Sequence, residues 1–88
     1  MPVRFNPGCI VATAGVMMQL NPESIAAALR RHLAGDWGEL DDEDKATNDA
    51  ALRNGGRLLS AYTYTGEKVW VITERDRSVT TVLLPDEY

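Results

Sequence analysis

The 88-residue sequence predicts an α+β fold of about four antiparallel strands, with two helices packed on one face. Three observations lead to this class. Apolar residues recur at helical spacing after residue 21, three segments with strand-like composition follow residue 57, and a short apolar segment lies near the N-terminus. Because no linker or repeat divides the chain, residues 1–88 are assigned to a single domain.

The first strand is expected over residues 9–13, an apolar segment that follows a turn. The more securely marked helix begins at Pro22, because Asn21 is a favourable N-cap and proline suits the first helical position. Gly35 is expected to end this helix. A second helix is expected from about Asp42 to Arg53, before a pair of glycines.

A three-strand meander is expected over residues 57–65, 68–74 and 78–84. Gly66 and Glu67 form the expected hairpin loop, which pairs Thr65 with Lys68. Both faces of this meander carry apolar side chains, whereas antiparallel sheets usually keep one face wet. We therefore expect helices on one face and the N-terminal segment or a partner subunit on the other. The expected assembly is a homodimer.

The net charge of −4 comes from 9 basic and 13 acidic residues, and it disfavours general nucleic-acid binding. The acidity is concentrated in residues 36–49, here called the acidic segment, where seven carboxylates face one lysine. One interpretation is a solvated helix start, since acids favour the first helical turn. The other is a docking surface for a basic protein partner. Its candidate partner-binding residues are Asp36, Trp37, Glu39, Asp41, Asp42, Glu43 and Asp44.

No metal or cofactor is expected. The contiguous carboxylates lack the alternating ligands and central glycine of a calcium loop. The chain has one His and one Cys, which do not make a usual zinc site. No apolar stretch approaches the roughly 20 residues of a membrane span, so we expect no membrane partner. A lone Cys without an export signal indicates a cytoplasmic location.

A small ribonuclease is an alternative function. Its acid/base pair would come from His32 and Glu74, while Arg75 and Arg77 would hold the phosphate. The order of elements resembles that of RelE-like and barnase-like ribonucleases. The competing interpretation gives His32 a structural role near the end of its helix. Under the leading hypothesis below, no residue is catalytic.

Three segments carry a more extensive resemblance. They are RHLAGDWG at residues 31–38, NDAAL at 48–52 and ITERDRSVTTVLLPDEY at 72–88. They resemble an uncharacterised family of small proteins from bacterial plasmids and integrative elements, often labelled plasmid-related protein. The resemblance implies a mobile-element setting and supplies no catalytic residues. The leading hypothesis is a non-enzymatic, protein-binding accessory protein that modulates or inhibits a host defence or regulatory protein. Beside the ribonuclease, a self-associating structural module is the third hypothesis for the function.

Overall fold

The structure, a computed structural model, describes residues 3–88. Four strands and four helical segments follow one another along the chain. They are β1 (Cys9–Ala12), α1 (Ala14–Gln19), α2 (Pro22–Leu33), α3 (Asp42–Asn54), β2 (Leu58–Tyr64), β3 (Glu67–Thr73), β4 (Val79–Leu83) and the 3-10 helix η1 (Pro85–Glu87). The fold is α+β, as the sequence predicts.

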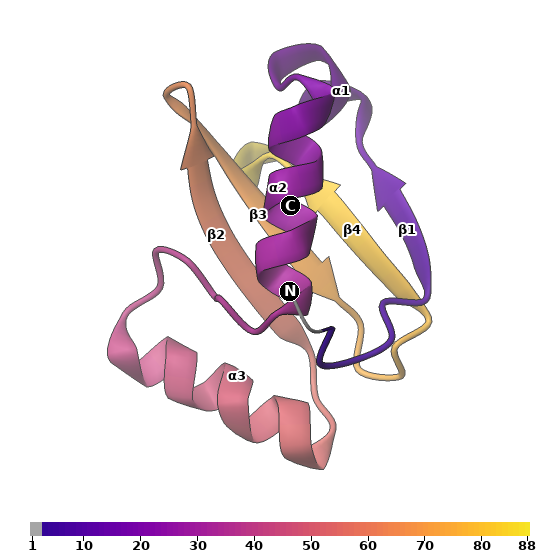
Figure 1. The fold of residues 1–88 in the computed structure, drawn as a ribbon, viewed down its shortest axis with the longest axis vertical. Helices are drawn as coiled ribbons and strands as arrows, with labels where there is room; N and C mark the ends of the chain where they lie inside the picture. The colour runs from indigo at the N-terminus through magenta and orange to yellow at the C-terminus, as the bar shows by residue number, and fades with distance from the viewer. Residues whose placement is uncertain (1–2) are drawn as a thin grey trace.

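The four strands form one sheet in the order β1-β4-β3-β2 (Figure 1). The meander is antiparallel throughout, as expected. β1 is different, because it pairs with β4 in parallel, with Cys9 opposite Val79. The sheet is therefore mixed, and the expectation of an antiparallel N-terminal strand is wrong. The helices between β1 and the meander carry the chain over one face, which is the crossover that a parallel strand needs.

The β2–β3 hairpin turns at Thr65 and Gly66, so Tyr64 faces Glu67. The expected pairing of Thr65 with Lys68 is therefore wrong by two residues. Thr65 and Gly66 both have positive φ, 50° and 82°, which matches the twist of a tight hairpin. A shift of two residues keeps every side chain on its predicted face, since side chains alternate with a period of two.

The two expected helices are present. Asn21, the expected cap of α2, accepts a hydrogen bond at Oδ1 from Ser24 N at 2.8 Å, and the structure identifies Asp41 as the cap of α3, with Oδ1 accepting from Asp44 N at 2.8 Å. α1 was not expected. It is a six-residue helix capped by the Thr13 side chain, in a segment whose apolar run does not distinguish helix from strand. α3 lies at the β2 edge of the sheet instead of over its face (Figure 1).

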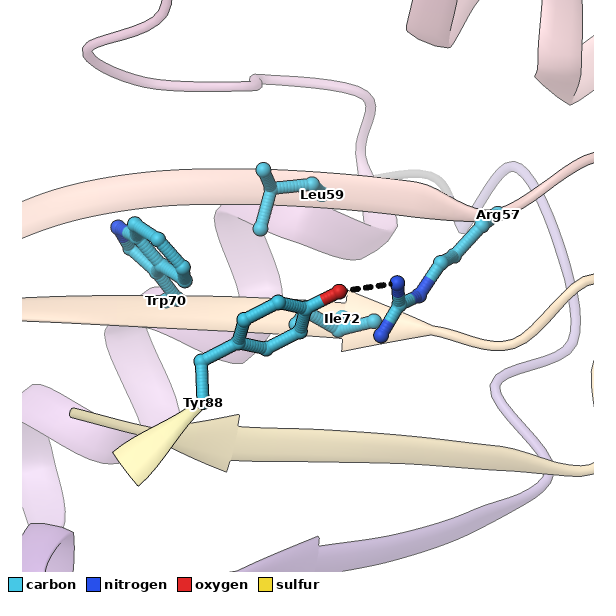
Figure 2. A pocket seen from close by; sticks show the side chains of 5 residues that line it. All are labelled: Arg57, Leu59, Trp70, Ile72 and Tyr88. Atoms are coloured by element: carbon cyan, nitrogen blue, oxygen red, sulfur yellow. Dashed lines mark hydrogen bonds between the residues drawn. The ribbon is translucent and has the colours of Figure 1, made fainter. Parts of the chain in front are cut away.

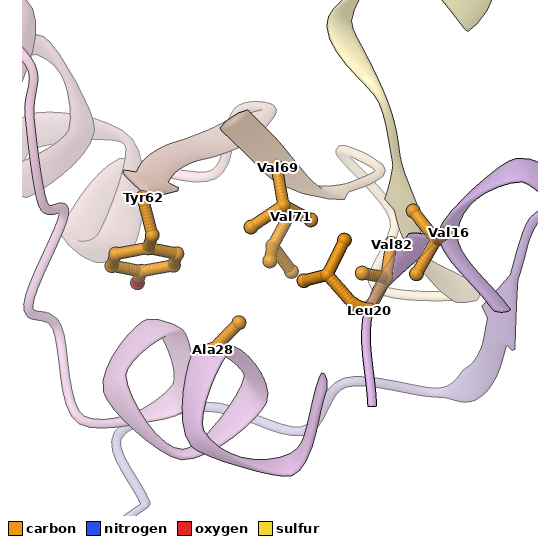
Figure 3. Close-up of a cluster of buried hydrophobic side chains, with 7 residues drawn as sticks. All are labelled: Val16, Leu20, Ala28, Tyr62, Val69, Val71 and Val82. Carbon is orange, nitrogen blue, oxygen red and sulfur yellow. The ribbon is translucent and has the colours of Figure 1, made fainter. Parts of the chain in front are cut away.

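The hydrophobic core lies between the sheet and the layer formed by α1 and α2 (Figure 3). Ala28 is the α2 residue in this buried cluster, and its small side chain permits close packing. The buried cluster consists of Val16, Leu20, Ala28, Tyr62, Val69, Val71 and Val82. These residues come from segments far apart in the sequence, so one cluster joins the N-terminal half to the meander.

On the opposite face of the sheet, Tyr88 lies against side chains of β2 and β3 (Figure 2). Tyr88 lies against Trp70 at a ring separation of 5.7 Å, and Arg57 donates a hydrogen bond to the Tyr88 hydroxyl at 2.5 Å. Together with Leu59 and Ile72 these residues line a cavity of about 260 Å³. The C-terminal residue therefore covers part of this face, and none of the described residues 3–8 lines the cavity.

Among residues 3–88, no helix has the length and apolar character needed to cross a membrane.

Candidate functional site

His32 projects from α2 into the interior and is fully buried. Its Nδ1 lies 2.5 Å from Ser60 Oγ and its Nε2 lies 2.9 Å from Thr73 Oγ1. Thr73 Oγ1 lies 2.7 Å from Thr80 Oγ1, and the Thr80 hydroxyl donates to the Pro7 carbonyl at 2.7 Å. This chain of hydrogen bonds, the His32 network, links α2 to three strands and to the segment before β1.

The Pro7 carbonyl at the end of the His32 network can only accept a hydrogen bond, and this determines which atom donates in each of the other bonds. The Thr80 hydroxyl donates its proton to the Pro7 carbonyl, so it must accept a hydrogen bond from the Thr73 hydroxyl. Because the Thr73 proton is used in that bond, Thr73 Oγ1 accepts a hydrogen bond from His32 Nε2. The neutral ring therefore carries its proton on Nε2, and Nδ1 accepts from Ser60. Both ring nitrogens are satisfied within the protein.

Burial and, to a smaller extent, the nearby positive charge of Arg77 together lower the pKa of His32 from 6.5 to about 4. The rings of Phe5 and Trp37 pack edge-on against the imidazole, at centroid distances of 5.4 and 5.7 Å. A sealed, neutral imidazole cannot exchange a proton with a substrate. His32 therefore has the structural role, and the geometry gives no support to its use in acid/base catalysis.

The other candidate ribonuclease residues do not converge with His32 in one cleft. Arg77 donates to the Ala51 carbonyl at 3.1 Å and to the Gly56 carbonyl at 2.5 Å, so it closes the end of α3. Glu74 Oε1 lies 3.8 Å from Arg57 Nε, and the Arg75 side chain is exposed. Glu74 and Arg75 line a shallow hollow of about 410 Å³ at the β3–β4 turn.

Most of the acidic segment is used inside the protein. Asp36 pairs with Arg31 at 2.7 Å, and this contact lowers the pKa of the Asp36 carboxyl. Glu39 accepts from the Thr63 hydroxyl at 3.0 Å, and Asp41 caps α3. Asp49 accepts from Trp37 Nε1 at 2.9 Å. These carboxylates hold the 36–41 loop and α3 in place.

Three acidic residues remain. Asp42, Glu43 and Asp44 form the first turn of α3, here called the acidic turn, and all three are exposed. Within residues 3–88 their carboxylates make no hydrogen bond or ion pair. Trp37, in contrast, is buried, so its side chain is not available to a partner, and its place among the candidate partner-binding residues is wrong.

The β2 edge of the sheet is closed by the chain itself. The Asn48 side chain accepts from Leu59 N at 3.2 Å and donates to the Leu59 carbonyl at 2.7 Å. Ala61 N donates to the Trp37 carbonyl at 3.2 Å, and Ala61 O accepts from Glu39 N at 2.7 Å. The outward-facing amides and carbonyls at Leu59 and Ala61 are thus satisfied, which prevents a foreign strand from adding there.

Replacing Asn48 with leucine is expected to lower the free energy of unfolding by about 2 kcal/mol, because it leaves an amide and a carbonyl of β2 unpaired beside a buried side chain. Urea unfolding followed by circular dichroism measures this loss. Thr47→Ala is the matched control on the exposed side of the same helix, with an expected change within about 0.5 kcal/mol. Equal stability of both variants would show that Asn48 does not close the edge.

The β1 edge has no such closure among the described residues. Ile10 and Val11 are 47% and 40% exposed, and Met17 and Met18 in α1 are 66% and 83% exposed. An apolar groove of about 370 Å³ lies next to this edge. It is lined by Ala12, Met17, Leu20, Pro22, Ile25, Ala26 and Leu29. This surface was not predicted from the sequence, although the adjacent methionines Met17 and Met18 are a signal for it.

No protein family, curated protein or solved structure matches this chain in the comparisons made. Among residues 3–88, no three His, Cys, Asp or Glu side chains lie close enough to hold a metal ion.

Proposed function

We propose that this chain is a non-enzymatic, protein-binding accessory protein of a bacterial mobile element. It acts in the cytoplasm as a homodimer, and it modulates or inhibits a host defence or regulatory protein. The mobile-element setting comes from the resemblance of residues 31–38, 48–52 and 72–88 to plasmid-borne proteins. The function itself is argued from the surface of the protein.

The observation that carries the proposal is the division of the acidic segment into two groups. Four of its carboxylates have partners within the protein, whereas Asp42, Glu43 and Asp44 have none among the described residues. Their placement on one helical turn produces a local field that attracts a basic surface. Such a field accelerates encounter and selects a partner more than it adds affinity.

The structural role of His32 also supports a binding protein over an enzyme. The chain has one histidine, and its ring lies in the His32 network, away from solvent. A ribonuclease with His32 as its acid or base would need that proton at a surface.

Neutralising the acidic turn with Asp42→Asn, Glu43→Gln and Asp44→Asn is expected to abolish or strongly weaken capture of a basic protein from a bacterial host. The wild-type complex is expected to weaken as salt rises, because the Debye length falls from about 10 Å at 0.1 M to about 3 Å at 1 M. Affinity purification from cells followed by sedimentation of the reconstituted complex measures both effects.

The matched control replaces two exposed acids outside the acidic segment, Glu23→Gln and Asp86→Asn. Circular dichroism checks that every variant is folded, since loss of acids from a helix start itself costs about 0.3–1 kcal/mol per charge. Unchanged capture by the neutralised protein, or an equal loss in the control, would refute the acidic turn as the docking surface.

A further inference from the structure

The open β1 edge and the groove beside it have a self-complementary form. We propose that the β1 strands of two copies of this chain pair antiparallel about a two-fold axis at Val11, and that each copy's Ile10 covers the groove of the other. This inference rests on the homodimer proposed above and identifies its interface.

The main chain of β1 shows which groups are available. Cys9 N donates to the Ser78 carbonyl at 3.0 Å, and Thr13 N donates to the Val82 carbonyl at 3.0 Å. Odd-numbered residues therefore direct their amides toward β4. The N–H and C=O groups of Ile10 and Ala12 point away from the sheet, because successive residues of a strand alternate in direction. Neither residue has a hydrogen-bond partner on that side among the described residues.

The ends of β1 restrict the register. Gly8 N already donates to Asn6 Oδ1 at 2.9 Å, and Ala14 is the first residue of α1. Pairing is therefore limited to Ile10 and Ala12. A two-fold arrangement that uses both places Ile10 opposite the partner's Ala12 and Val11 opposite the partner's Val11. This register forms four hydrogen bonds between the strands.

The same register fills the groove. Ile10 and Ala12 share the face covered by α1 and α2, where Ala12 lines the groove beside Met17 and Leu20. Side chains opposite each other in an antiparallel pair have Cβ atoms about 5 Å apart. The partner's Ile10 therefore lies against Ala12, over the groove of about 370 Å³. In the single chain this isoleucine is 47% exposed, so pairing removes two apolar surfaces from water.

The distribution of charge favours a second copy as the occupant. The strand Cys9–Ala12 contains no charged residue, so self-pairing brings no like charges together. The acidic turn belongs to α3, beside β2 at the other edge of the sheet (Figure 1). Pairing through β1 sets the two acidic turns at least roughly 30 Å apart, well over the Debye length of about 8 Å in physiological salt. Pairing through the β2 edge would bring them together.

Sedimentation equilibrium of the full chain is expected to show a monomer–dimer equilibrium. Ile10→Pro removes the outward amide without removing a hydrogen bond to β4, so it is expected to raise the dissociation constant about 30-fold or more through two lost bonds per dimer. Ile10→Val is the matched control, because it keeps both the amide and an apolar side chain, and it is expected to change the constant only a few-fold. Circular dichroism verifies that both variants are folded.

A cysteine placed at the axis tests the register independently of Ile10. In a Cys9→Ser background, Val11→Cys is expected to form a disulfide between copies in a glutathione buffer. Opposed residues at such a position have Cα atoms about 4.5 Å apart, within disulfide range. The native Cys9 is the control. In the proposed register the two copies of Cys9 lie roughly 14 Å apart and do not link.

The outcomes separate the interface from the proposed function. A wild-type monomer at high micromolar concentration overturns both this pairing and the homodimer, and leaves the acidic turn to be judged by its own test. A dimer that tolerates Ile10→Pro and does not link through Val11→Cys overturns the β1 pairing while the homodimer stands. A foreign extended peptide that protects the β1 amides of a monomeric wild type would identify a different occupant and overturn the proposal.

Discussion

Acidification from pH 7 to pH 4 is expected to lower the free energy of unfolding by about 3 kcal/mol through His32 alone. The pKa of this side chain is 6.5 in an exposed peptide and about 4 in the folded protein. Between these values the unfolded chain binds a proton that the folded protein does not. The stabilisation is therefore complete above pH 6.5, falls as the pH decreases toward 4, and falls no further below that.

Urea unfolding at a series of pH values measures this effect, with the double variant His32→Leu and Ser60→Ala as the reference. The double variant removes the imidazole together with the Ser60 hydroxyl that bonds to Nδ1. No buried Ser60 hydroxyl is therefore left without a hydrogen-bond partner. Carboxylates titrate in both proteins. The difference between their curves of unfolding free energy against pH therefore gives the contribution of His32. Parallel curves would show that the histidine titrates normally and is open to solvent, which would revive an acid/base role.

Gly38→Ala is expected to lower the free energy of unfolding by about 4 kcal/mol. Gly38 has a φ of +77°, in the region that disfavours other residues, and an added Cβ would lie 2.0 Å from the Ala61 carbonyl oxygen. The backbone must therefore shift, and the bond from Ala61 N to the Trp37 carbonyl is lost with it. The β2 edge then opens, so we also expect this variant to aggregate on heating.

Gly66→Ala separates the two causes. Gly66 also has a φ of +82°, but an added Cβ there meets nothing within 4 Å. Its expected cost is about 1 kcal/mol, from the backbone conformation alone. Thermal unfolding of the two variants compares them directly. Similar destabilisation of both would mean that Gly38 is not held against β2.

The sequence predicts most of the fold because its signals are local. Asn21 and Pro22 mark the start of α2, glycines follow both α2 and α3, and the composition of the meander marks three strands. The direction of β1 has no local signal, because it depends on how the helices carry the chain across the sheet. α1 is hidden for a related reason: six apolar-rich residues fit a strand as readily as a helix.

The candidate site is harder to predict because it depends on which side chains are already occupied. The sequence shows which carboxylates the acidic segment contains, but it does not show which of them have partners inside the protein. Asp49 accepts a hydrogen bond from Trp37, and Asp36 forms an ion pair with Arg31. The ribonuclease hypothesis likewise depends on the surroundings of His32. Residues of three strands and of the N-terminal segment bury this side chain, so it is not accessible to a substrate. The open β1 edge follows only from the strand order.

The two edges of this sheet are built differently, because β2 is closed by its own chain and β1 is open for a second strand. Amide hydrogen exchange, followed by NMR at low and high protein concentration, distinguishes the two edges residue by residue. Leu59 and Ala61 amides are expected to be protected at every concentration, because Asn48 and Trp37 hold them. Ile10 and Ala12 amides are expected to exchange freely in dilute protein and to become protected as concentration rises. Exposure of the Leu59 and Ala61 amides, or unchanged exchange at Ile10 and Ala12 in a sample shown to be dimeric, would contradict the claim.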